Sequence, residues 1–172
     1  MWNFKYKDEF EHYVAELNRH PDVQAMRAFP QHAEGVSTYD HAVLVAYSSF
    51  RICEALGLDA ASAARGGLLH DLFLYNWQER KGEAFLDHMN NHPRYALENA
   101  EARFALNDTE RDVILSHMWP VTPTKFYHKW ESFIVSCMDK ACATAELLHL
   151  VPWLTRERET IPARHLPLYA VR

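Results

Sequence analysis

The chain has 172 residues, of which 48% are hydrophobic and 13% aromatic, and its formal net charge is −5. A chain of this length and composition can fill one hydrophobic core, so we expect a single globular domain. Its longest apolar runs are shorter than the roughly 18 residues that span a bilayer, and its N-terminal segment is too polar for a secretory signal. These features argue against a membrane protein or a membrane partner and predict a cytoplasmic protein.

The charged residues form no basic block, which argues against binding to a nucleic acid duplex. Three cysteines without a CxxC spacing indicate reduced, buried thiols and not a disulfide framework. Histidine is the unusual residue type, with eleven in the chain. The positions of these histidines therefore decide the functional interpretation.

The sequence pattern is helical almost throughout, because glycines are few and alternating β-branched runs are rare. We therefore predict an all-α fold. The first helix should cover about residues 7–28 and end before Pro30, since the residue preceding a proline is pushed out of the α region. A loop through Gly35 should follow.

A second helix is predicted at about residues 39–56. Ser37 and Thr38 are both suitable N-caps for it, and Gly57 suits the left-handed position that follows a helix end. A third helix should run over about residues 59–76 and contain the apolar stretch GLLHDLFLYNW.

Residues 78–92 have the composition of a polar connection, with one helical turn near residues 84–88. Pro93 suits the first position of a new helix, which makes His92 the predicted N-cap of that helix. A further helix should begin after Asn107.

That further helix, preceded by Asn107 and Asp108, should run to about His117. The segment PVTPTKFY is predicted to be a loop, because it contains two prolines and no apolar periodicity. A long helix should follow at about residues 130–150, and the remaining residues should form a tail.

Several histidine and aspartate side chains fall on helix faces that are otherwise apolar. His41 shares its face with Leu44 and Val45, which follow it by three and four residues, and Asp139 lies on the face of Val135. The full set is His41, His70, Asp71, His92, His117 and Asp139.

Each of these residues has an ordinary structural explanation when it is taken alone. An inward histidine is most often hydrogen-bonded to a backbone carbonyl, and Asp139 could simply pair with a lysine. Burying all six without a cation, however, would leave several polar groups unsatisfied at once. On a helix the side chains of the adjacent His70 and Asp71 would point about 100° apart. This arrangement would allow both residues to coordinate one ion located beside the helix. The set therefore favours a metal site.

The order of these residues, in the motifs STYDH, LLHDL, NHPRYA, SHMWP and MDKA, resembles that of the HD superfamily of metal-dependent phosphohydrolases. The resemblance covers about residues 38–146. It implies a single HD-type helical bundle over residues 1–172, with its core at about 38–150 and a C-terminal tail at 151–172. The two extra histidines before the last aspartate resemble the branch that holds a pair of metals, whose members include enzymes that hydrolyse symmetrical dinucleoside polyphosphates or open cyclic dinucleotides.

The resemblance also implies a role for each position. It implies that His41, His70, Asp71 and Asp139 bind a first ion, that Asp71 bridges to a second ion held by His92 and His117, and that His70 and Asp71 form the catalytic pair. Imidazole and carboxylate ligands suit divalent Fe, Mn, Zn, Co or Ni, and we favour Fe or Mn. We expect a metal-activated water to cleave a phosphate ester or anhydride of a nucleotide or other small phosphorylated metabolite. Di-iron oxygenase chemistry, a non-catalytic regulatory role that binds metal or nucleotide, and assembly into a homo-oligomer all stay open.

Three further residues are candidates for contacting a small anionic, phosphate-containing substrate. Lys140 follows the last aspartate, Arg94 follows the NHP motif, and Trp119 is placed to stack on a base. The alternatives are a solvent-exposed role for both basic residues and a core role for Trp119. The HD pair is followed by LFLYNW, so it lacks the polar group that several HD enzymes place there. His88 is an alternative ligand, and His32 stays ambiguous.

Overall fold

The computed structural model describes residues 4–150, and within them the fold is all-α, as predicted. Two short 3₁₀ helices and one isolated β-bridge, between Pro30 and Ser37, accompany the α-helices. No helix in this part of the chain is long and apolar enough to cross a membrane. The α-helices are α1 Phe4–Arg19, α2 Pro21–Ala25, α3 Thr38–Leu56, α4 Ala60–Leu69, α5 Glu83–Glu101, α6 Asp108–Ser116 and α7 Trp130–Leu147.

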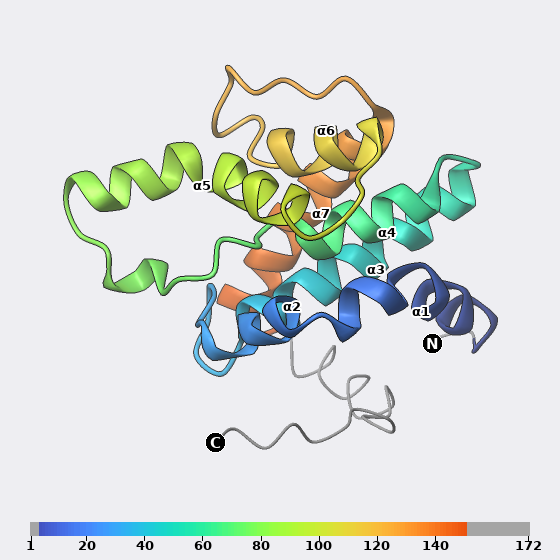
Figure 1. Cartoon of the computed structure of the whole chain (residues 1–172), viewed down its shortest axis with the longest axis horizontal. Helices are drawn as coiled ribbons and strands as arrows, with labels where there is room; N and C mark the ends of the chain where they lie inside the picture. The colour runs from blue at the N-terminus through green and yellow to red at the C-terminus, as the bar shows by residue number, and fades with distance from the viewer. Residues whose placement is uncertain (1–3, 151–172) are drawn as a thin grey trace.

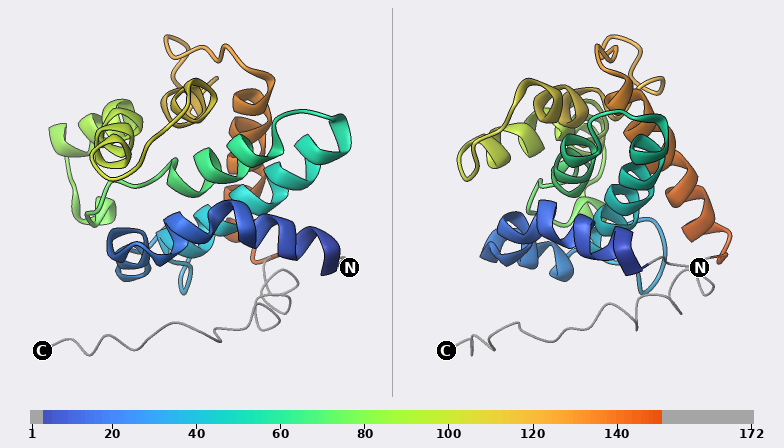
Figure 2. Two further views of the ribbon diagram at one scale, coloured as in Figure 1. Left: turned by 45° about the vertical axis from the view of Figure 1, so that its right-hand side comes forward. Right: turned by 90° about the vertical axis from the view of Figure 1, so that its right-hand side faces the viewer.

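The helices are arranged around the pair formed by α3 and α4, which pack closely against each other (Figure 1). Helix α7 crosses this pair and also contacts α6, as both views in Figure 2 show. Helix α1 packs against α4. Helix α5 lies to one side of the bundle, where it contacts α6 and α4. Helices α3, α5, α6 and α7 therefore all contact α4.

Helix α3 has the boundaries that local sequence signals predict. Ser37 is its N-cap and forms a capping box with Asp40, since each side chain bonds the backbone N–H of the other residue. Gly57 ends the helix with φ 68°, a conformation that favours glycine. The predicted break at Asn107 is likewise confirmed, because Asn107 caps α6 in a second capping box with Glu110.

The contact between α3 and α4 depends on Gly67. A Cβ atom at this position would lie 2.9 Å from the backbone Cα of Ala46 in α3. Real Cβ atoms essentially never approach so closely, so any side chain here would push the two helices apart. Gly67 therefore brings the end of α4 close to α3.

We expect Gly67→Ala to lower the free energy of unfolding by about 2 kcal/mol, because the helices must separate to admit the methyl group. Chemical denaturation would measure the change. The control Ala55→Ser, on the exposed side of α3, should stay within about 0.5 kcal/mol of the parent. A Gly67→Ala protein as stable as the parent would show that the two helices do not need this close approach.

The single helix predicted for residues 7–28 is wrong, because the chain breaks between Arg19 and Pro21. His20 adopts an extended conformation, φ −72° and ψ 133°, as expected for a residue that precedes a proline. Its ring nitrogen Nδ1 accepts a hydrogen bond from the Asp22 backbone N–H at 3.2 Å and so caps α2. A 3₁₀ turn at Met26–Ala28 then completes the segment.

The helix predicted for residues 59–76 ends early, at Leu69, so His70 and Asp71 lie in the turn that follows it. The cause is the His70 side chain, whose Nδ1 bonds the Gly67 carbonyl at 2.7 Å. In a continuing helix that carbonyl would accept the Asp71 backbone N–H, so the side chain competes with the helix. The expectation that His70 and Asp71 are neighbours within a helix is therefore wrong. The Asp71 carboxylate instead extends from the turn that follows α4.

Helix α5 begins about ten residues earlier than predicted, so His92 is not an N-cap but lies inside a helix that continues through Pro93. The early turns of α5 fall in the segment 78–92, for which the sequence predicted a polar connection with one helical turn near residues 84–88. That turn is part of a helix that begins at Glu83. Helix α7 ends at Leu147, slightly before the predicted end. The predicted tail, residues 151–172, lies outside the described residues.

Candidate metal centre

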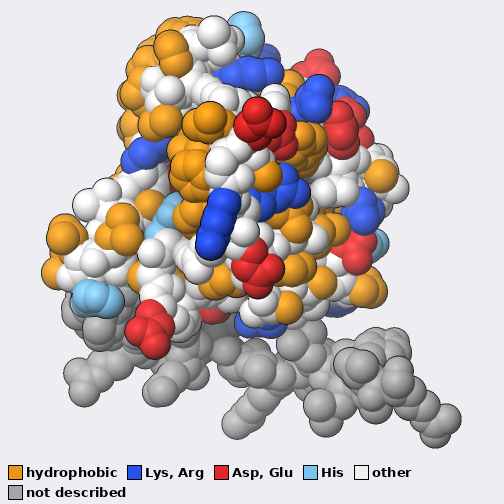
Figure 3. All heavy atoms as spheres, turned by 90° about the vertical axis from the view of Figure 1, so that its left-hand side faces the viewer, with side chains coloured by type: hydrophobic (Ala, Val, Ile, Leu, Met, Phe, Trp, Pro, Cys, Tyr) orange, Lys and Arg blue, Asp and Glu red, His pale blue; other side chains and the backbone are white. Residues whose placement is uncertain are grey.

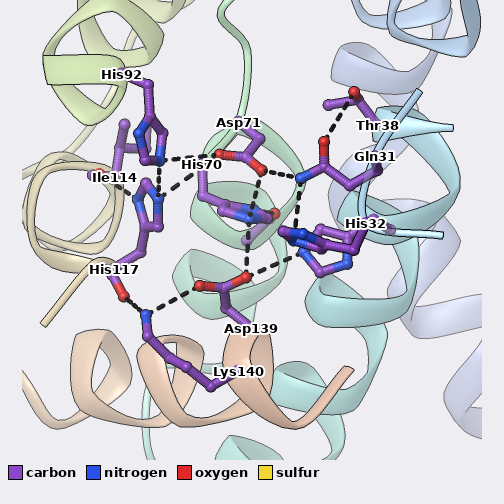
Figure 4. A network of polar contacts seen from close by, with 12 residues as sticks. Gln31, His32, Thr38, His70, Asp71, His92, Ile114, His117, Asp139 and Lys140 are labelled. Carbon is purple, nitrogen blue, oxygen red and sulfur yellow. Dashed lines mark hydrogen bonds and ion pairs between the residues drawn. The ribbon is translucent and has the colours of Figure 1, made fainter. Parts of the chain in front are cut away.

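The structure brings the six predicted ligands together in one buried cluster. Figure 4 shows His70, Asp71, His92, His117 and Asp139 around its centre. They come from different parts of the fold: His41 from α3, His70 and Asp71 from the turn after α4, His92 from α5, His117 from the end of α6 and Asp139 from α7. None is more than 7% exposed. The cluster therefore joins helices that are far apart in the sequence.

A first group of donor atoms surrounds one oxygen of Asp139 and one of Asp71. His41 Nε2 lies 3.0 Å from Asp139 Oδ1. His70 Nε2 lies 3.7 Å from the same oxygen and 3.4 Å from Asp71 Oδ2. These four residues are the ones for which the resemblance to HD proteins implies binding of a first ion.

A second group surrounds the other oxygen of Asp71. Asp71 Oδ1 lies 3.5 Å from His92 Nε2 and 3.6 Å from His117 Nε2. The two imidazole nitrogens are 2.9 Å apart. Asp71 therefore stands between the two groups and offers one oxygen to each.

The hydrogen bonds of the histidines fix which ring nitrogen faces the centre. In His70, His92 and His117, Nδ1 lies against a backbone carbonyl, which can only accept a hydrogen bond. Each Nδ1 must therefore carry a proton, and each ring turns Nε2 toward the centre. The three bonds run to the carbonyls of Gly67 at 2.7 Å, His88 at 2.8 Å and Ile114 at 2.8 Å. Burial opposes a charge on His70, but the nearby Asp71 and Asp139 outweigh burial and raise the pKa of this ring.

These tautomers leave donor atoms that only a cation can satisfy. The Nε2 lone pairs of His92 and His117 face each other at 2.9 Å, an arrangement that is repulsive without a positive charge between them. His70 Nε2 and Asp71 Oδ1 are buried without a hydrogen-bond partner. Neighbouring ligands of an ion with bonds of about 2.1 Å are roughly 3.0–3.4 Å apart, close to the separations observed. The residues present therefore fit divalent metal ions. Overlapping triads of donor atoms lie within 4.8 Å of one another, namely His41–His70–Asp71, Asp71–His92–His117, His70–His117–Asp139 and His32–His41–Asp139.

The electrostatic balance of the cluster favours the protonation states that metals need. Burial disfavours the charged form of Asp71, but His70, His92 and His117 outweigh it and hold the pKa of its carboxyl well below the usual range. Burial also lowers the pKa of His92, and that of His117 further still. The carboxylate is therefore ionised and these two imidazoles are neutral, as metal ligands must be.

Glu146 belongs to the centre, although the sequence prediction missed it. Its carboxylate oxygens lie 3.0 and 3.1 Å from His41 Nδ1, and the side chain is fully buried. A carboxylate behind a ligating histidine orients the ring and raises its basicity. Glu146 follows Asp139 by seven residues, so it lies on the same face of α7, and this spacing could have identified it.

Gln31 and His32 reach the centre from the loop before α3. Gln31 Nε2 donates to Asp71 Oδ2 at 2.7 Å, and its Oε1 accepts from the Thr38 hydroxyl at 3.2 Å, so the amide orientation is fixed. The His32 ring packs edge-on against that of His41, with centroids 4.9 Å apart. Both residues lie in a loop, where helical periodicity gives no information. No sequence pattern therefore predicted the role of Gln31.

Of the predicted substrate-binding residues, only Lys140 lies at the centre. Its Nζ donates to Asp139 Oδ2 at 3.0 Å and also to the carbonyl of His117. The ammonium group thus links α7 to the end of α6 and holds one oxygen of Asp139, which leaves the other facing the imidazoles.

Arg94 and Trp119 lie away from the ligands. Arg94 is exposed on α5, where its Nε is 3.6 Å from Glu98 Oε1. Trp119 packs in an aromatic cluster, with its ring centroid 5.2 Å from that of Tyr127 and 6.0 Å from that of Phe133. Neither residue lines the cleft that leads to the ligands.

That cleft has a volume of about 90 Å³ and opens beside Asp71, His92 and Asp139. His88 forms part of its wall, with its ring stacked between those of Trp77 and His92. Burial, and then the neighbouring His92, lower the pKa of His88 to about 4. His88 Nδ1 lies 2.9 Å from the Tyr75 hydroxyl, and the His88 ring stacks on that of His92. His88 belongs to neither ligand group.

The structure places the three cysteines differently from the prediction that all are buried. Cys53 and Cys142 are buried free thiols, and burial raises the pKa of each to about 12. Cys137 is exposed. The two buried thiols are therefore protonated and unreactive.

Comparison with known proteins identifies the family. The family model described as HD domain matches residues 38–122, a segment that begins at α3 and ends in the loop after α6. It contains five of the six clustered residues, and Asp139 follows it on α7. Searches of curated proteins and of solved structures gave no match. The HD match, the all-α fold and the histidine–aspartate cluster agree, and residues 38–122 of this chain form an HD domain.

Proposed function

We propose that this protein is a metal-dependent phosphohydrolase that cleaves a phosphate ester or anhydride of a small metabolite. HD domains bind divalent metals and the family consists mostly of metal-dependent hydrolases. The observation that carries the proposal is the position of Asp71, whose two oxygens face two separate groups of imidazoles. A carboxylate so placed suits a site for two ions.

His41, His70, Asp139 and one oxygen of Asp71 would hold the first ion, and His92, His117 and the other oxygen of Asp71 would hold the second. Imidazole and carboxylate ligands suit Fe and Mn among other divalent metals. A pair of such ions, when bound, lowers the pKa of a shared water and stabilises negative charge on the phosphoryl oxygens.

The residues of the chain prepare the centre for this chemistry. Glu146 and three backbone carbonyls orient the four imidazoles, so little rearrangement is needed when an ion binds. Gln31 holds one oxygen of Asp71. Phe73 and Met118 line the cleft and exclude bulk water, which strengthens electrostatic interactions inside it.

The proposal is tested by purifying the protein with Mn²⁺ or Fe²⁺, measuring bound metal and screening phosphate esters and anhydrides. We expect about two ions per chain and release of phosphate that continues without oxygen. Product formation that requires oxygen would instead identify an oxygenase. Thermal stabilisation by nucleotides without turnover of any compound would identify a regulatory module.

Metal affinity should increase with pH. Burial works against a charge on His41, but its hydrogen bonds with Asp139 and Glu146 outweigh burial and raise its pKa to about 10. The metal-free protein therefore carries a proton on His41 at neutral pH, and an ion must displace it. Since at least one proton is released, the affinity for Mn²⁺ should rise about tenfold from pH 7 to pH 8.

Titration calorimetry in buffers of different ionisation enthalpy measures this proton release directly. The same affinity at both pH values, with no proton released, would show that His41 does not take part in binding the ion.

A further inference from the structure

The size of the cleft limits how much of a substrate can reach the ligands. Its volume is about 90 Å³, and a water molecule occupies about 30 Å³ of liquid. Sites that enclose a drug-sized ligand are about 300–1,000 Å³. The cleft itself is therefore large enough for about one phosphoryl group and an attacking water, and the further phosphates of a chain would lie outside it.

The walls of the cleft are apolar or neutral apart from the metal ligands. Phe73, Trp77, Met89 and Met118 supply apolar surface, and Gln31 supplies a neutral amide. The group next to the phosphoryl would contact thioether and aromatic surface, which suits an uncharged group.

No lysine or arginine is among the described residues that line the cleft. The nearest ammonium, on Lys140, is bound to Asp139 and to a backbone carbonyl. On the face where α5 lies, basic side chains are scattered among hydrophobic and acidic ones and form no continuous patch (Figure 3). A substrate with several phosphates would find no cationic side chain for the additional charges within the cleft.

A neighbouring groove of about 300 Å³ shares Phe73 with the cleft and contains Arg80. The Arg80 guanidinium stacks on the Tyr75 ring at 3.8 Å and lies 3.7 Å from an oxygen of Asp87. Glu98 also lines this groove. The negative charges of Asp87 and Glu98 offset the positive charge of Arg80. The groove therefore does not favour a polyphosphate either.

We propose that the substrate carries a single phosphoryl group esterified to a small, uncharged alcohol, and that polyphosphates are poor substrates. This inference rests on the proposed phosphohydrolase function and narrows its substrate class. Water attacks phosphorus, the phosphorus–oxygen ester bond breaks, and the alcohol leaves with a proton taken from that water while inorganic phosphate forms. Bound metals would neutralise the charge on the transferred group, so a single phosphate would not require a cationic side chain in the cleft.

The test compares kcat/KM of the full-length, Mn²⁺-loaded protein for phenyl phosphate, ATP and diadenosine tetraphosphate. We expect phenyl phosphate to be preferred by at least about tenfold, because each uncompensated charge near a dry site is unfavourable. Equal or better turnover of the polyphosphates would overturn this inference and leave the phosphohydrolase function intact. If the metal-loaded protein hydrolyses none of these three compounds and no other phosphate ester, the proposed phosphohydrolase function is wrong.

A charge introduced at the cleft tests the physical reason for the preference. Met89 is partly exposed and lies one helical turn before His92, so Met89→Arg would place a cation beside the cleft. In this variant the ratio of kcat/KM for phenyl phosphate to kcat/KM for ATP should fall by at least about tenfold. Met89→Lys introduces the same charge and should have the same effect. The control Leu86→Arg adds the same charge at an exposed position on α5 and should leave the preference unchanged. A preference that stays the same in Met89→Arg and Met89→Lys, both shown to be folded and metal-loaded, would overturn the inference.

Discussion

Asp71→Asn should lose at least about a thousandfold in kcat/KM, equivalent to about 4 kcal/mol of transition-state stabilisation. Asp71 is the residue that both groups of imidazoles share, with Oδ2 in the first and Oδ1 in the second. The asparagine amide has nearly the same size but offers one neutral oxygen in place of two charged ones. Both ions should therefore bind poorly, and metal analysis should find fewer than one ion per chain.

The matched control for this variant is Asp108→Asn. Asp108 is 95% exposed on α6 and makes only a surface contact with Arg111, so its replacement removes one negative charge without touching the centre. We expect the control to retain full activity and metal content. An Asp71→Asn protein with the metal content and activity of the control would refute the shared role of this carboxylate.

Glu146→Gln should weaken metal binding by about 10–100-fold, the usual effect of removing a charged partner behind a ligating histidine. Both Glu146 oxygens face His41 Nδ1, so the charge that makes this ring a strong ligand is lost although the ring keeps a hydrogen-bond acceptor. Activity should fall at limiting Mn²⁺ and recover when the metal is in excess, which distinguishes this variant from Asp71→Asn.

Metal titrations of the variant and of the control Glu54→Gln, which lies on the exposed side of α3, would measure the difference. If Glu146→Gln binds Mn²⁺ as tightly as the control does, then Glu146 only fills space behind His41 and does not tune the ligand.

The features that local sequence patterns determine could be predicted. Ser37 and Gly57 set the ends of α3 through a cap and a left-handed residue, which act within a few positions of themselves. The inward faces of His41 and Asp139 followed from helical periodicity. The order of all six histidine and aspartate residues then indicated a shared centre, and the structure brings those residues together.

The features that depend on tertiary contacts could not be predicted in the same way. Helix α4 stops before His70 because this ring bonds the carbonyl three residues earlier, and this competition is decided by where the other ring nitrogen must point. The end of α6 near His117 was predicted correctly. Gln31 lies in a loop, so its bond to Asp71 has no sequence pattern. Arg94 lies exposed on α5, which is the alternative that the sequence analysis kept for it.

Anomalous scattering from crystals grown with Mn²⁺ tests the central claim most directly. The two-ion arrangement predicts two anomalous peaks, one among His41, His70, Asp71 and Asp139 and the other among Asp71, His92 and His117. Crystals that show no peak between these side chains, or metal bound only elsewhere on the protein, would contradict it.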